Sequence, residues 1–79
     1  MHQISFGNSM ARIDLNEFFY PMQLVEALKP YFEETCSVKA FKAGPDRIVV
    51  ELRPKSGASL EELALSFCNN ALAMRQNWD

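Results

Sequence analysis

The sequence predicts an α+β domain with the element order βαββα, in which a three-stranded antiparallel sheet carries two helices on one face. Apolar and polar residues alternate as they do in half-buried strands, and a β-branched run lies at residues 48–52. Two further stretches have apolar residues at steps of three and four, as amphipathic helices do. The length of 79 residues fits a single domain, which we place at residues 11–79.

The first ten residues allow two interpretations. They contain the turn-forming run Gly7-Asn8-Ser9. Residues 1–10 form either an N-terminal tail, because termini fray unless they are held, or an extra strand over residues 3–6 that folds back as a hairpin onto the next strand.

The first strand of the domain is expected at residues 11–15. Its polar residues, Arg12 and Asp14, alternate with apolar ones. A period of two places the apolar side chains on the face toward the core. These core residues are Ala11, Ile13 and Leu15.

A helix follows and is expected to begin at Pro21, because proline suits a first helical position that uses no backbone N–H. Its apolar stripe consists of Leu24, Val25, Leu28, Tyr31 and Phe32. Pro30 removes a helical hydrogen bond, so we expect a kink or a break near Lys29.

A hairpin and a second helix complete the domain. Strands are expected at residues 36–43 and 48–52, joined at residues 44–47 by a turn that contains proline and aspartate. Ser59 and Glu62 fit a capping box at the start of a helix that runs to about residue 77.

A right-handed crossover between the first two strands places the third strand between them, in the order 1-3-2. This split βαβ plan is ferredoxin-like without the final strand. Residues 11–15 would then form an open edge, where an extended peptide or a second copy of the chain can pair. Arg12 and Ile13 are therefore candidate partner-binding residues, and a homodimer is one expected arrangement.

Aromatic residues gather before the first helix, at Phe18, Phe19 and Tyr20. Two of these three rings are expected to hold the helix against the core. The alternative is that the run is an exposed anchor for a partner. Trp78, near the chain end, either closes the core or docks on another chain. All four residues are candidates for binding a partner.

No residue pattern points to catalysis, to a metal or to a cofactor. His2, the only histidine, lies in the terminal segment, and Cys36 and Cys68 lack the neighbours that a metal site or a redox motif requires. Eight basic and ten acidic residues give a net charge of −2, which disfavours nucleic acid as a partner. Neither a membrane-spanning run nor a signal peptide is expected, so the expected location is cytoplasmic.

Several segments carry a family resemblance: Ile13-Asp14-Leu15, Tyr20-Pro21, a strand that closes on Leu52-Arg53-Pro54-Lys55, and Phe67-Cys68-Asn69-Asn70. Over about residues 11–76 the chain resembles HxsD, a family of small proteins of the bacterial His-Xaa-Ser system. The resemblance implies an accessory protein that works beside radical-SAM enzymes in modifying a ribosomally made peptide. It carries over no catalytic residue, and the chain lacks a CxxxCxxC motif.

We therefore expect a non-enzymatic adaptor that binds a peptide or protein partner. The alternative is a self-associating regulatory domain, or a small-ligand-binding domain, of ferredoxin-like type.

Overall fold

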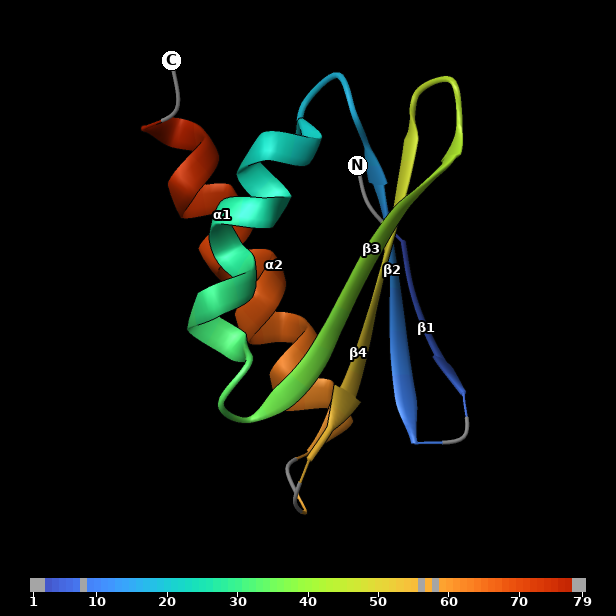
Figure 1. Cartoon of the computed structure of the whole chain (residues 1–79), viewed down its shortest axis with the longest axis vertical. Coiled ribbons are helices and arrows are strands. Elements are labelled where there is room, and N and C mark those ends of the chain that lie inside the picture. The colour runs from blue at the N-terminus through green and yellow to red at the C-terminus, as the bar shows by residue number, and fades with distance from the viewer. Residues whose placement is uncertain (1–2, 8, 56, 58, 78–79) are drawn as a thin grey trace.

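Two helices pack on one face of a four-stranded antiparallel sheet in the computed structural model, which describes residues 3–7, 9–55, 57 and 59–77 (Figure 1). The elements in chain order are β1 (Gln3–Gly7), β2 (Met10–Asn16), α1 (Met22–Phe32), β3 (Cys36–Gly44), β4 (Arg47–Pro54) and α2 (Leu60–Gln76). The predicted α+β class is confirmed.

β1 is the main difference from the sequence prediction. The strand order is β1-β2-β4-β3, so the prediction of a sheet with only three strands is wrong. The three predicted strands are β2, β3 and β4, and β4 lies between the other two as predicted. β1 pairs antiparallel with β2, from Gln3 opposite Asp14 to Gly7 opposite Met10. Ser9, in the turn between them, has a left-handed φ of 58°, which a tight hairpin requires. Of the two interpretations of the first ten residues, the structure has the extra strand.

β2 consequently lies inside the sheet. It pairs with β1 on one side and with β4 on the other, so that Ile13 stands opposite both Ile4 and Val50. The prediction that residues 11–15 form an open edge is wrong, because β1 already occupies the backbone groups on that side. Within the described residues, the two edges of the sheet are β1 and β3.

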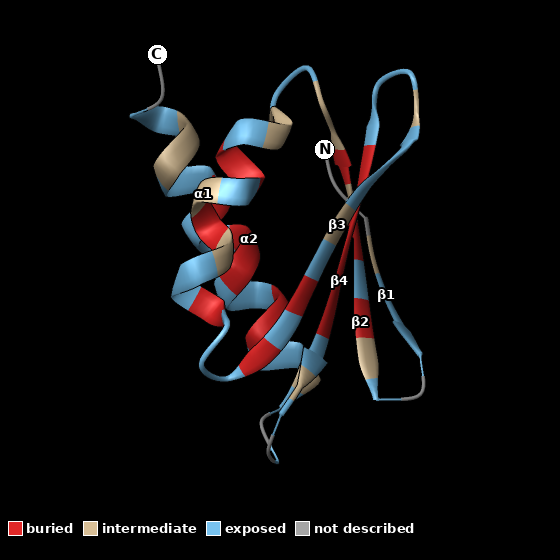
Figure 2. Ribbon diagram, in the orientation of Figure 1, coloured by how far each residue is buried: buried red, intermediate tan, exposed pale blue. Residues whose placement is uncertain are grey.

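The core lies between the sheet and the two helices (Figure 2). Alternate residues of β2 and β4, such as Ile13 and Val50, point into it and are fully buried. Phe67 of α2 is 0% exposed, and its ring centroid lies 5.2 Å from that of Phe32 in α1. Burial of this apolar surface is the main source of stability in a domain of this size.

The helix ends follow local chemistry. α1 begins at Met22, one residue after the predicted start, and Pro21 is its N-cap. The helix continues through Pro30 without the break that was one of the two expectations. Pro30 and Glu26, whose carbonyl loses its helical donor, are both exposed, so water can satisfy that carbonyl. α2 begins as predicted, because the Glu62 N–H donates to Ser59 Oγ at 3.3 Å.

Candidate functional site

Phe18, Phe19 and Arg75 form a surface that we call the aromatic patch. The two phenylalanines lie in the loop between β2 and α1, and Arg75 lies in the last turn of α2. Arg75 Nε donates a hydrogen bond to the carbonyl oxygen of Phe19 at 2.9 Å. This bond joins the C-terminal end of α2 to the loop across 56 residues of sequence.

Asn16 fixes the conformation of the loop. Its side-chain Oδ1 accepts a hydrogen bond from the Phe18 N–H at 2.8 Å. Its carbonyl oxygen accepts from the N–H groups of Phe19 and Tyr20, at 3.1 and 2.9 Å. An asparagine side chain that binds the backbone two residues onward stabilises a turn. The backbone that carries Phe18 is therefore held before any partner arrives.

The three aromatic residues of the loop meet different environments. Tyr20 is 7% exposed and belongs to the core, whereas Phe19 is 41% and Phe18 is 83% exposed. The expectation that two of the three rings pack in the core is wrong, because the turn at Asn16 directs Phe18 and Phe19 outward. Their rings meet edge to face, with centroids 5.4 Å apart and planes at 73°.

Arg75 adds a positive charge to the patch. Its guanidinium carbon lies 5.0 Å from the Phe19 ring centroid and 6.0 Å from that of Tyr20, within the range of cation–π attraction. None of the ion pairs among the described residues includes Arg75. The described part of the chain thus supplies no carboxylate to its guanidinium.

A hollow of about 390 Å³ lies on this surface, lined by Phe18, Phe19, Pro21, Arg75 and Gln76. The rings and the proline provide apolar walls, and the guanidinium can form two parallel hydrogen bonds to a carboxylate. The hollow can therefore hold an apolar side chain that lies next to an acidic group. The sequence pattern identifies the two phenylalanines but not Arg75, because a basic residue at a helix end is ordinarily explained by the helix dipole.

A second hollow lies between the helices. It also measures about 390 Å³ and is lined by Leu28, Tyr31, Asn70, Ala73, Met74 and Asn77. None of these described lining residues is acidic or basic. They offer apolar contact and amide hydrogen bonds but no charge with which to select a ligand, so the aromatic patch has the more specific chemistry.

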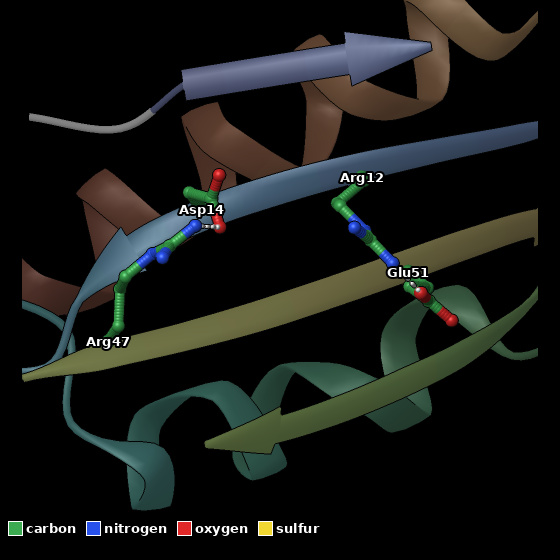
Figure 3. Close-up of polar contacts among 4 residues, drawn as sticks. All are labelled: Arg12, Asp14, Arg47 and Glu51. Carbon is green, nitrogen blue, oxygen red and sulfur yellow. Dashed lines mark hydrogen bonds and ion pairs between the residues drawn. The ribbon is translucent and has the colours of Figure 1, made fainter. Parts of the chain in front are cut away.

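The two candidate residues on β2 do not lie at a free edge. Ile13 is fully buried in the core. Arg12 lies on the opposite face of the sheet, where its Nη2 is 2.8 Å from Glu51 Oε2 on β4 (Figure 3). Arg47 and Asp14 bridge the same two strands at 3.1 Å. These contacts give Arg12 and Ile13 structural roles inside the sheet.

Glu51 is only 9% exposed, although the strand face that carries it has no helix over it. The hydrogen bond from Arg12 lowers the pKa of the Glu51 carboxyl below its usual value and outweighs the opposing effect of burial. The carboxylate therefore stays charged at neutral pH and paired with Arg12. This pair crosses from β4 to β2 and helps to fix their register.

Neither thiol is suited to nucleophilic chemistry. Cys36 and Cys68 are free and buried, and burial raises the pKa of each, which disfavours the reactive thiolate. Among the described residues, no group of three His, Cys, Asp or Glu could hold a metal ion. His2 and the partner-binding candidate Trp78 lie outside the described residues. No helix of the described chain has the length and apolar content needed to cross a membrane.

Comparison of the chain with protein-family models, with curated proteins and with solved structures finds no match. The resemblance to HxsD therefore stays a prediction from the sequence.

Proposed function

We propose that the protein is a non-enzymatic adaptor that binds a peptide segment of a partner protein at the aromatic patch. The observation that carries the proposal is the 83% exposure of Phe18 in a loop whose backbone is fixed by Asn16. A large apolar ring held in water contributes little to folding. It is available to a partner at a small entropic cost, because the loop is already ordered.

The composition of the patch resembles that of strong binding sites. Aromatic residues and arginine are over-represented among the residues that dominate the free energy of protein association. Phe18 supplies apolar area, and Arg75 supplies a cation whose position is set by the Phe19 ring and carbonyl. The expected ligand is a peptide with an apolar or aromatic side chain next to an acidic side chain or a C-terminal carboxylate.

The class of partner follows from the resemblance to HxsD alone. It points to a protein or peptide of a radical-SAM maturation system, in which this chain would bring components together without performing the chemistry. The buried thiols, with their raised pKa values, support a binding role rather than catalysis by cysteine.

Selection from a phage-displayed library of short random peptides tests the proposal. The expected result is enrichment of peptides that combine an aromatic or aliphatic residue with a neighbouring carboxylate. Their binding should fall roughly tenfold or more in Phe18→Ser and in Arg75→Gln, because each change removes one of the two recognised groups.

Tyr31→Ser provides the matched control. Tyr31 is also an exposed aromatic residue, but it lies on α1 and lines the other hollow. The control should bind the selected peptides as the unmodified protein does. Absence of any enriched peptide, or equal binding by Phe18→Ser and Arg75→Gln, contradicts the proposal. Loss of binding in Tyr31→Ser alone would move the site to the hollow between the helices.

A further inference from the structure

We propose that the protein forms a twofold homodimer in which β1 pairs antiparallel with β1 of a second copy. This pairing would join two four-stranded sheets into one continuous sheet, with both pairs of helices on the same face. The inference concerns a different surface from the aromatic patch and does not depend on the proposed function.

The two edges of the sheet are protected to different degrees. β3 carries Lys39 and Lys42, and its register shifts between Lys42 and Gly44. Edge lysines and bulges are devices by which sheets avoid pairing with other chains. β1 has the sequence Gln-Ile-Ser-Phe-Gly and contains neither a charged residue nor a proline. The chain thus blocks one edge and leaves the other able to pair.

β1 also extends beyond the cover of the helices. Ile4 and Phe6 stand opposite Ile13 and Ala11, which are core residues, so their side chains lie on the helix-bearing face. The helices pack mainly on the other strands, with α2 against β2 and β4 and with α1 against β3. Phe6 is consequently 51% exposed at the border of the apolar core.

The register of the proposed pairing follows from the length of β1. Only the arrangement with Ser5 opposite Ser5 of the second copy pairs all five residues of Gln3–Gly7. It also places Ile4 opposite Phe6 of the second copy, once on each side of the axis. Pairs of an aromatic and a β-branched residue are favourable across antiparallel strands. The exposed Phe6 ring would gain an apolar neighbour in each copy.

Charge favours a second copy as the occupant of this edge. A twofold axis brings every residue near it close to its own duplicate, so a charged residue there would meet a like charge. β1 carries no charge. Among the described residues, the nearest charged side chains are Arg12 and Asp14 on β2, which pair with Glu51 and Arg47. Residues 3–7 therefore contribute no like-charge repulsion to self-pairing.

Sedimentation equilibrium from low to high micromolar concentration tests this inference. The interface is short, so we expect a weak dimer whose population rises with concentration. Ser5→Lys places like charges at the axis and should weaken association roughly tenfold or more. The matched control, Ser37→Lys, makes the same change at an exposed position of β3 and should leave association unchanged. Thermal melting establishes that both variants are folded.

Cross-linking tests the register. Ser5→Cys places two thiols opposite each other at a separation that a disulfide can span with small adjustment. Mild oxidation should then give a covalent dimer, while Ser37→Cys should give no covalent dimer. The two native cysteines do not compete, because both are buried. A protein that is monomeric at every concentration, or a dimer disrupted by Ser37→Lys and not by Ser5→Lys, overturns the inference.

Discussion

Two pairs of phenylalanine rings in this protein have nearly the same separation and opposite surroundings. The centroids of Phe32 and Phe67 lie 5.2 Å apart inside the core, and those of Phe18 and Phe19 lie 5.4 Å apart at the surface. The first pair joins α1 to α2, whereas the second belongs to one loop. The separation of the rings does not distinguish the two pairs, but burial does.

The difference separates two uses of the same side chain. A buried ring stabilises the fold in proportion to the apolar surface that it removes from water. An exposed ring on an ordered loop contributes little to folding. Its apolar surface can instead contribute to the free energy of binding when a partner covers it. Substitutions in the two pairs should therefore affect different measurements.

Phe67→Ala should have the largest effect on folding. Truncation of a fully buried phenylalanine costs about 3–5 kcal/mol, and a small domain has only about 5–15 kcal/mol of stability in total. We expect the variant to be largely unfolded, so that circular dichroism shows no cooperative thermal transition. A melting temperature within a few degrees of the unmodified protein would mean that the buried pair is no more important to the fold than the exposed one.

Arg12→Met extends the comparison to a polar pair. This change leaves the nearly buried Glu51 carboxylate without its hydrogen-bond donor. In the folded protein the pKa of the Glu51 carboxyl is lowered from its ordinary value of 4.5. The pair therefore stabilises the fold above that value, and its contribution disappears as the pH falls through the lowered pKa. The difference in unfolding free energy between the variant and the unmodified protein should be largest at neutral pH and shrink in acid.

Urea unfolding at a series of pH values measures this difference. Glu51→Gln serves as the control, because it removes the titrating group. In that background, adding Arg12→Met should change the unfolding free energy by the same amount at every pH. A difference that is constant from neutral to acid pH would show that Arg12 acts by packing rather than by its charge.

Ser59→Ala measures how much a single exposed helix-cap hydrogen bond contributes to the unfolding free energy. It removes the acceptor for the Glu62 N–H at the start of α2 and should destabilise the fold by about 1 kcal/mol. The midpoint of urea denaturation should fall with an unchanged slope. Ser59→Asp, which keeps a capping oxygen, should retain most of the stability; an equal loss in both variants would argue against the cap.

Phe18→Ala should have the smallest effect on folding. Its ring is mostly in water, and substitutions at such positions usually change stability by less than about 0.5 kcal/mol. The unfolding midpoint in urea should match that of the unmodified protein. A loss of stability comparable to that of Phe67→Ala would remove the distinction between the two ring pairs.

The sequence predicts what depends on local pattern and less of what depends on long-range contacts. The Ser59 cap, the apolar face of α2 and the β4 strand follow from spacing and residue type. β1 has only Ile4 and Phe6 as its alternating apolar residues, a signal too short to distinguish a strand from a frayed terminus. That one strand decides which backbone edge is free.

The candidate site shows the same limit. The run of aromatic residues at 18–20 is visible in the sequence, but the turn that buries Tyr20 and exposes Phe18 depends on hydrogen bonds to Asn16. The contact of Arg75 with Phe19 joins the end of α2 to a loop near the start of the chain. Nothing in the spacing of these two residues predicts that they meet.

The central claim is that the exposed pair, with Arg75, binds a partner. The most direct test is a nuclear magnetic resonance titration of the isotope-labelled protein with the peptide that binds best in the library selection. The predicted result is a set of shifts confined to the amides of residues 16–20 and the end of α2, abolished by Phe18→Ser. Shifts confined to the hollow between the helices or to the β1 edge, with residues 16–20 unmoved, would contradict the claim.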